Sequence, residues 1–272
     1  MPAISTNTAA NSAVRYLNIN SQQETSALSK LSSGSRITSA SDDAAGLAIS
    51  TRISSDITTL QQAATNAAQA TSILQTADGG ASNISDILAR MKSLASESAS
   101  GTVADSSRAY INSEFTQLKG EIDSIASGTR YSSQSLLDGS SVFSSGVSVL
   151  VGSTSADTIT ITLTSLTASS LSVTSLDVSS LSSATSAMTA LDTAIDKVSS
   201  ARAEIGAQES RFNFSADSIS TQTLQSANSA IKDVDIASEQ ATLSSAEVKT
   251  QAAVSAETAA NQMPQYLLKL LG

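Results

Sequence analysis

The stretch DDAAGLAISTRISSDITTLQQAATNAAQATSILQT, residues 42–76, places small and apolar side chains at steps of three and four. That spacing forms one stripe on an α-helix, and a coiled-coil seam where it is sustained. The stripe consists of Ile49, Ile53, Ile57, Leu60, Ala64, Ala67, Thr71 and Leu74. This stretch therefore predicts a long helix whose apolar face packs against another helix.

A second stripe with the same period lies near the other end of the chain. It consists of Met188, Leu191, Ile195, Val198, Ile205, Phe212 and Ile219. Stripes that are distant in sequence but equal in period most simply pair with each other. The predicted fold is mainly α: a long antiparallel coiled-coil-like helical hairpin or bundle, formed by the N- and C-terminal segments, with the first and last residues at one end.

Local signals are expected to bound the helix of the first stripe. Asp42, Asp43 and Gly46 form the predicted cap and turn at its start, where carboxylates favour the exposed N–H groups. Paired acids can also act as acid and base, but no other catalytic group accompanies these two. The sequence ADGG (77–80) predicts the end of the helix, with a glycine as its left-handed cap.

A further helix is predicted over residues 105–127, because apolar side chains again recur at steps of four and three. Its stripe consists of Ile111, Phe115, Leu118, Ile122 and Ile125. The middle of the chain changes to period two in VSVLVG (147–152) and DTITITLT (157–164), and more weakly in LSVTSLDV (171–178). Alternation of this kind is typical of β-strands, so we expect a small β-hairpin or sheet inserted between the helical arms.

The two ends of the chain carry apolar side chains at helical spacing with nothing local to bury them. The residues that we expect to act in assembly are Val14, Leu17, Leu28, Leu31, Val248, Leu267, Leu268, Leu270 and Leu271. Pro264 predicts a kink or an end of the last helix near Gln262. Ordering a residue costs about 1–2 kcal/mol, so we expect the ends to be disordered in the free chain and to fold on docking onto identical copies.

The pattern divides the chain into three predicted parts. Residues 1–42 with 234–272 form a terminal coiled-coil domain, and residues 43–139 with 180–233 form a helical core domain. Residues 140–179 form a small β insert that faces the surface. The predicted seam of the helical core consists of Ile49, Ile53, Ile57, Leu60, Ile111, Phe115, Leu118, Leu191, Ile195, Val198, Ile205 and Phe212.

Composition excludes several classes of function. The 272 residues contain no cysteine and no histidine, which removes disulfides, thiolate metal sites and the commonest general base. A net charge of −9 argues against nucleic-acid binding. No apolar run approaches the ~20 residues of a membrane span, and the N-terminus lacks the pattern of a cleaved secretory signal. We therefore expect no catalytic residues, no metal, no cofactor and no membrane contact.

Three stretches resemble one known family. LSSGSRITSASDDAAGLAIS (31–50) resembles the N-terminal signature of bacterial flagellins, and ANQMPQYLLKLL (260–271) is similar to their C-terminal signature. VSSARAEIGAQESRF (198–212) is similar to a further stretch of that family. The resemblance covers residues 1–139 and 185–272, and its central part has room only for a minimal form without large outer domains.

The resemblance implies a structural subunit that polymerises into the extracellular flagellar filament and serves swimming. It also implies export of the unfolded chain by the flagellar type III apparatus, and contacts with an export chaperone, a filament cap and hook-associated proteins. The alternative is a hook–filament junction protein, which has similar ends but should not form long filaments alone. A small hydrolase or ligand-binding module is a third reading, but the sequence offers no convergent polar groups for a pocket.

The resemblance further implies contact with a toll-like innate immune receptor. The matching positions are Arg90, Leu94 and Glu114. Ala89, Ser93 and Ser96 depart from the family pattern beside them, so we expect weak or absent activation. The Ser/Thr-rich middle, residues 140–186, leaves two readings open, namely acceptor sites for O-linked sugars or a solvated β face.

Overall fold

The computed structural model describes residues 7–219 and 221–271, apart from the side chains of Leu267, Leu268, Leu270 and Leu271. The chain divides into two compact units. Unit 1 consists of Met1–Ile57 with Gln222–Gly272, and unit 2 consists of Thr58–Thr221. This division does not follow the breaks at residues 42 and 234 that the sequence suggested; the three-part organisation stays a prediction.

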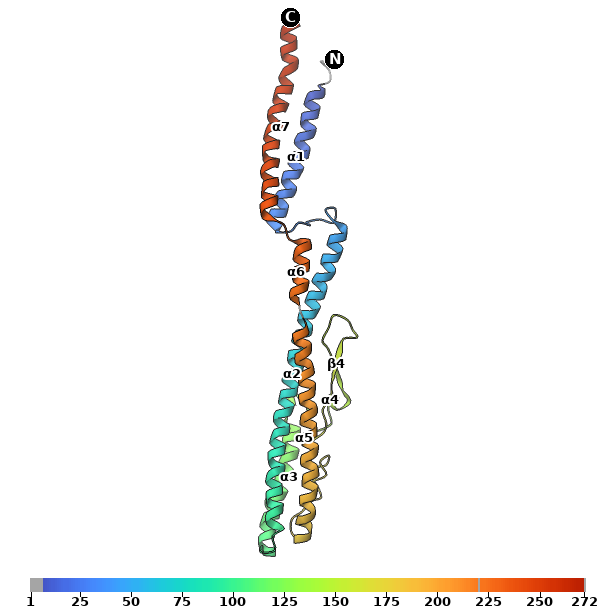
Figure 1. The fold of residues 1–272 in the computed structure, drawn as a ribbon, viewed down its shortest axis with the longest axis vertical. Helices are drawn as coiled ribbons and strands as arrows, with labels where there is room; N and C mark the ends of the chain where they lie inside the picture. Colours follow the sequence, from blue (N-terminus) through green and yellow to red (C-terminus); the bar gives the residue numbers. More distant parts are fainter. Residues whose placement is uncertain (1–6, 220, 272) are drawn as a thin grey trace. The chain divides into compact units, whose positions relative to one another are not determined.

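Unit 1 is built around an antiparallel pair of helices, α1 (Thr8–Ser33) and α7 (Ile236–Leu271), which lie side by side (Figure 1). Asn7 caps the start of α1, since its side-chain oxygen accepts from the N–H of Ala10 at 3.1 Å. Gly34 ends the helix with a φ of +68°, the left-handed conformation that glycine adopts without strain. The unit also contains α6 (Thr221–Lys232) and the first part of α2 (Ala44–Ser98).

The break after α1 is joined to the break after α6 by a short antiparallel bridge between Ser35 and Asp233. The N–H of Arg36 donates to the carbonyl of Lys232 at 2.6 Å, and the N–H of Val234 donates to the carbonyl of Gly34 at 3.1 Å. These backbone bonds tie together two segments about 200 residues apart in sequence, so the base of the α1–α7 pair is fixed by chain pairing.

Unit 2 is a bundle of the remainder of α2 with α3 (Asp105–Gly128) and α5 (Leu181–Ser218) (Figure 1). The predicted helix over 105–127 is therefore confirmed. Periodic side chains of the three helices fill one core, together with residues of the segment that follows α3. The largest fully buried side chains are Phe115, Phe212, Leu74, Ile84, Leu88, Met91, Leu94, Ile122, Leu136, Leu137, Ile161 and Leu166.

Short elements fill the middle of unit 2. After α3 come β1 (Arg130–Tyr131), β2 (Gln134–Ser135), α4 (Val142–Ser145), β3 (Val147–Leu150) and β4 (Thr158–Ile161). β1 pairs with β2, and β3 pairs with β4 antiparallel, with Val147 opposite Ile161. In β4, Ile159 and Ile161 are buried while the alternating threonines are exposed, as period two requires. The mainly α fold class with a small β insert is thus confirmed.

The third predicted strand, residues 171–178, is wrong. Its backbone groups bond elsewhere: the side-chain oxygen of Asn112 accepts the N–H of Val178 at 3.0 Å, and Lys119 donates to the carbonyls of Thr174 and Leu176. Val173 closes a local turn through a bond to Ala168. Side chains of α3 therefore satisfy the groups that a strand partner would have needed.

The predicted helix end at residues 77–80 is also wrong, because α2 continues to Ser98. A Cβ on Gly80 would lie 2.4 Å from Oγ1 of Thr129 and 2.9 Å from Cδ1 of Leu137, whereas a Cβ on Gly79 would meet nothing within 4 Å. Because Gly80 has no Cβ, the segment after α3 can approach α2 closely at this position. The glycine therefore has a role in packing and does not end the helix.

The helix end predicted at Pro264 is not present, because α7 runs from Ile236 to Leu271. A proline has no N–H, so Pro264 cannot donate to the carbonyl four residues earlier, that of Ala260. The side-chain Nδ2 of Asn7 donates to this carbonyl at 2.8 Å. A donor from α1 thus replaces the missing one, and helix α7 continues.

Hydroxyl side chains on the long helices turn inward to their own backbone. Thr71 donates to the carbonyl of Ala67 at 3.1 Å, Thr76 to that of Ser72 at 2.8 Å, and Thr258 to that of Val254 at 2.9 Å. Each bond spans four residues, the typical spacing of this contact within a helix. The abundant Ser and Thr residues are therefore compatible with long helices.

Candidate assembly surface

Unit 1 leaves large apolar side chains uncovered. Of the assembly residues predicted from sequence, Val14 is 38% exposed, Leu28 is 58% exposed and Val248 is 70% exposed. Leu17 and Leu31 are half-buried. The remaining four, Leu267, Leu268, Leu270 and Leu271, have side chains that lie outside the described residues.

The sequence analysis did not assign a role in assembly to several other exposed apolar side chains of unit 1. Tyr266 and Val248 lie 18 residues apart on α7, which is five turns of 3.6 residues, so they share one face. Met263 lies one turn before Tyr266, and each is 63% exposed. The further exposed apolar residues of this unit are Tyr16, Ile19, Ile49, Ile236 and Val254. The 18-residue spacing could have been found in the sequence.

The contact between α1 and α7 uses small side chains. Ala27 of α1 is buried, as are Ala246, Ala253 and Ala260 of α7, which recur at intervals of seven residues. Leu243 is the one large side chain buried on α7 among its described residues. The pair therefore buries methyl groups against each other and leaves its larger apolar side chains to solvent, an arrangement typical of surfaces that meet a partner.

The predicted core seam is placed residue by residue. Fully or nearly fully buried are Phe115, Leu191, Val198, Ile205 and Phe212 in unit 2, and Ile57 in unit 1. Half-buried are Ile53, Leu60, Ile111, Leu118 and Ile195. Ile49 is 52% exposed and joins the uncovered side chains of unit 1.

The turn before α2 is closed by the two predicted acids. Oδ2 of Asp42 accepts the backbone N–H groups of Thr38 and Ser39, each at 2.9 Å, and the hydroxyl of Thr38 at 3.0 Å. The bonds from Ser39 and then Thr38 lower the pKa of Asp42 from 3.8 to about 2. Oδ1 of Asp43 accepts the N–H of Gly46 at 2.8 Å and so caps α2.

Gly46 is buried against this cap. A Cβ there would lie 2.4 Å from Oδ2 of Asp43 and 2.8 Å from Cδ1 of Ile37. A larger residue would therefore push the capping carboxylate out of place. The turn has the geometry of a structural support, in which both carboxylates are used by the backbone.

The three positions expected for receptor contact lie on α2 and α3. Arg90 donates from Nε and from its terminal nitrogen to Oε1 of Glu114, at 3.0 and 2.7 Å, and both side chains are about half-exposed. Leu94 is 2% exposed and belongs to the core of unit 2. Only the ion pair is therefore accessible at the surface; the contact itself stays a prediction.

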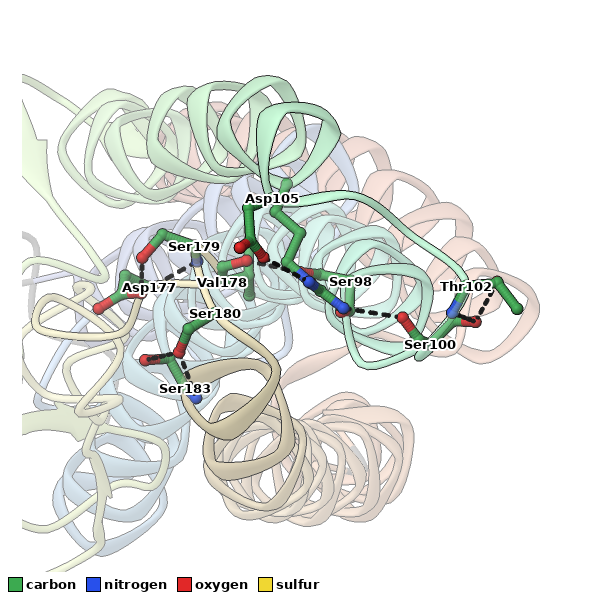
Figure 2. Close-up of polar contacts among 10 residues, drawn as sticks. Ser98, Ser100, Thr102, Asp105, Asp177, Val178, Ser179, Ser180 and Ser183 are labelled. Carbon is green, nitrogen blue, oxygen red and sulfur yellow. Dashed lines mark hydrogen bonds and ion pairs between the residues drawn. The ribbon is translucent and has the colours of Figure 1, made fainter.

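A buried arginine that the sequence analysis missed holds the turn between α2 and α3. Figure 2 shows Ser98, the last residue of α2, beside Val178, where the chain approaches α5, and Ser100 beside Thr102 in the turn that follows α2. The hydroxyl of Ser98 donates to the carbonyl of Val178 at 2.5 Å, and Arg108 donates to the carbonyls of Ser98 and Ser100. The backbone N–H of Ser179 in turn lowers the pKa of Asp177.

Among residues 7–219 and 221–271, no group of three or more acidic side chains is placed to hold a metal ion. Within the same ranges, no helix is long and apolar enough to cross a membrane. We call the exposed apolar side chains of α1 and α7 the hairpin surface: Val14, Tyr16, Ile19, Leu28, Val248, Val254, Met263 and Tyr266.

Comparison with known proteins adds an independent observation. The family model for the bacterial flagellin N-terminal helical region matches residues 4–142, and the model for the bacterial flagellin C-terminal helical region matches residues 188–271. The first match covers all of α1, α2 and α3, and the second covers α6, α7 and most of α5.

Individual relatives agree with these matches. A flagellin of Listeria monocytogenes is 33% identical over 271 residues, which is 94% of each chain. A flagellin of Clostridium tyrobutyricum is 46% identical over 139 residues, or 51% of this chain and 37% of that longer protein. The crystal structure of Bacillus cereus flagellin is similar with a TM-score of 0.52 and 31% identity, covering 60% of this chain and 93% of that one. Because both helical ends match and a relative aligns along nearly its whole length, this chain belongs to the bacterial flagellin family.

Proposed function

We propose that this chain polymerises with copies of itself into a flagellar filament through the hairpin surface. One observation carries the proposal: α1 and α7 bury alanines against each other and leave Leu28 and Val248 more than half exposed. Flagellin homologues form the flagellar filament, which is extracellular, so a structural role outside the cell follows from family membership.

Burial of the hairpin surface supplies the driving force. Each Val, Leu or Met side chain contributes about 1.5–3 kcal/mol when it is moved fully out of water. Several such side chains along two long helices favour an obligate interface, of roughly 2,000–5,000 Å². A contact that repeats between different faces of successive copies does not close, and it therefore builds a helical filament.

The family assignment decides between the alternatives. Flagellins are structural filament proteins, so the chain is not an enzyme. The hook–filament junction reading is not favoured, because the matched models and relatives are flagellins. Junction and filament proteins also differ in behaviour, since only a filament subunit should extend seeds into long polymers.

Seeded polymerisation tests the proposal directly. Purified full-length chain is mixed with short filament fragments, and growth is followed by light scattering and electron microscopy. We expect Leu28→Glu to raise the critical concentration at least tenfold, because a carboxylate must then be buried in the interface. Gln22→Glu is the matched control: Gln22 is exposed on α1, and the change adds the same charge. Growth of Leu28→Glu equal to that of the control would overturn the proposal.

We infer finer partners from the family resemblance. An export chaperone would bind the C-terminal segment before export through the type III apparatus, and a cap and hook-associated proteins would meet the filament ends. Co-purification of the chaperone with the full chain, and its loss when residues 236–271 are removed, tests the first contact.

For a toll-like receptor we propose weak or absent activation. The exposed ion pair of Arg90 and Glu114 is the accessible part of the matching region, whereas Leu94 is buried. A receptor reporter assay on free chain decides the matter: strong activation at nanomolar concentrations would contradict the proposal, and the Arg90→Ala chain serves as the reference.

A further inference from the structure

The methyl seam between α1 and α7 does not by itself fix how far the two helices are shifted along their axes. Ala246, Ala253 and Ala260 recur every seven residues and present identical side chains to α1. These three positions on α7 are equivalent to one another, so the alanines add little to the choice of alignment. Polar contacts between the two helices therefore contribute to it.

Three polar ties join the segments of this pair. At the base, the bridge between Ser35 and Asp233 pairs the backbone. Further along, the hydroxyl of Thr250 lies 3.3 Å from Oε2 of Glu24 and 2.9 Å from the carbonyl of Ala246, so its one proton is shared between the two acceptors. At the far end, Nδ2 of Asn7 donates to the carbonyl of Ala260 at 2.8 Å, joining residues 253 positions apart.

The tie at Asn7 is specific to one position on α7. Inside a helix every carbonyl normally accepts an N–H from the residue four positions later, but Pro264 has none to give to Ala260. The sequence contains two prolines, and Pro264 is the one inside α7. A carbonyl that lacks its helical N–H donor because of a proline therefore occurs once along α7, whereas the buried alanines recur every seven residues.

Both functional groups of the Asn7 amide are used. The oxygen accepts the N–H of Ala10 and starts α1, while the nitrogen donates to Ala260. The residue that caps α1 is thus aligned with Ala260 on α7. An alanine at position 7 would lose both bonds, and an aspartate would keep the cap and lose the donor.

We propose that Asn7 holds the far end of α1 in axial register on α7 by supplying the hydrogen bond that Pro264 withholds, and that it is thereby a positioning residue for filament assembly. The proposal rests on the proposed function, since the register determines which side chains of the hairpin surface lie level with one another. A single asparagine can fix register in this way in coiled coils, where the apolar contacts are repetitive.

A double-mutant cycle tests the proposal. Asn7→Asp removes the donor and retains the cap, and we expect it to raise the critical concentration for seeded growth about tenfold. Pro264→Ala restores an N–H to the helix, so the same change in that background should alter the critical concentration by about twofold or less. Asn11→Asp, one turn further along α1 at an exposed position, controls for the added charge.

The axial register of α1 on α7 is measured separately from filament growth, by chemical cross-linking. The chain has no cysteine, so Glu24→Cys with Thr250→Cys introduces one pair, at positions whose native side chains are in contact. A short thiol-reactive cross-linker should join the pair efficiently with Asn7 present, and at least fivefold less efficiently in the Asn7→Asp chain. Addition of Pro264→Ala to the Asn7→Asp chain should leave the yield low, because no bond then joins position 7 to the carbonyl of Ala260.

The outcomes separate the two proposals. Equal cross-linking and equal growth in the Asn7→Asp and Asn11→Asp chains would overturn the register assignment. The same holds if Asn7→Asp raises the critical concentration by the same factor with and without Pro264→Ala. Failure of the unaltered chain to extend seeds, with cross-linking that still depends on Asn7, would instead overturn the filament function alone.

Discussion

Arg108 donates from Nε to the carbonyl oxygen of Ser98 at 2.8 Å, so a side chain of α3 closes the end of α2. The same guanidinium donates to the carbonyl of Ser100 at 2.9 Å and to Oδ1 of Asp105 at 2.7 Å. The Arg108 side chain is 7% exposed and that of Asp105 is 91% exposed. The buried partners of the arginine are therefore backbone carbonyls.

Replacement of Arg108 by methionine should destabilise unit 2. The change leaves two carbonyls without a donor, at about 1–3 kcal/mol each, so we expect the free energy of unfolding to fall by about 2–4 kcal/mol. Urea denaturation followed by circular dichroism measures this. Arg90→Met, which breaks a half-exposed ion pair, is the control and should cost about 1 kcal/mol or less. Equal effects of the two changes would contradict the structural role of Arg108.

The turn before α2 should depend on pH. The pKa of Asp42 is lowered from 3.8 to about 2 by bonds from Ser39 and Thr38. Because the unfolded chain takes up this proton first, the stabilising contribution is present above about pH 4 and is lost as the pH falls through about 2. Carboxyl NMR titration of Asp42 measures the pKa. Thr38→Val removes one donor and should raise it, and an unchanged titration curve would argue against these bonds.

Adjacent glycines in α2 should respond oppositely to the same substitution. Gly79→Ala adds a methyl group to open space in a helix interior and should stabilise the chain by about 0.5–1 kcal/mol. Gly80→Ala drives a methyl group into Thr129 and Leu137 and should destabilise it by about 1–3 kcal/mol. Thermal unfolding of the two variants gives both signs; a gain in both would mean that the close approach at Gly80 is not maintained in solution.

Among Met91, Met188 and Met263, the methionines that the structure describes, oxidation should begin at Met263. This side chain is 63% exposed, Met188 is half-buried and Met91 is fully buried. Dilute hydrogen peroxide transfers one oxygen to an accessible thioether and leaves water, so exposure decides the order. Peptide mass spectrometry over time should find the sulfoxide of Met263 well before that of Met91. The order should disappear in urea, where all the thioethers are accessible.

Periodicity alone predicted most of the fold. Stripes at steps of three and four predicted the long helices that contain Leu191 and Phe115, and alternation predicted the strands around Ile159. These signals are local and repeat over many residues.

The errors came from positions at which distant parts of the chain override a local preference. Gly80 looks like a helix stop, but its contacts with Thr129 and Leu137 require the absent side chain. Pro264 looks like a helix break, but Asn7 supplies the donor from the other end of the chain. Neither partner can be inferred from the neighbouring residues.

The assembly surface could be predicted only in part. Large apolar residues such as Leu28 and Val248 were expected to matter, and they lie exposed, but a stripe does not reveal which of its members faces the partner helix within the chain. Small residues took that place: Ala27 and Ala253 are buried in the seam. Arg108 was missed because its role depends on carbonyls exposed by the turn at Ser100, which no residue-type pattern records.

The inward hydroxyls of the long helices limit what their outer faces can offer a neighbour. A threonine such as Thr76, whose proton is committed to the carbonyl of Ser72, keeps lone pairs for water but has no hydrogen left to give. Two faces of this kind brought together would meet acceptor against acceptor, and they would not adhere. In the proposed assembly, such stretches leave attachment to the apolar positions between them, and this lowers the chance of misaligned contacts between identical chains.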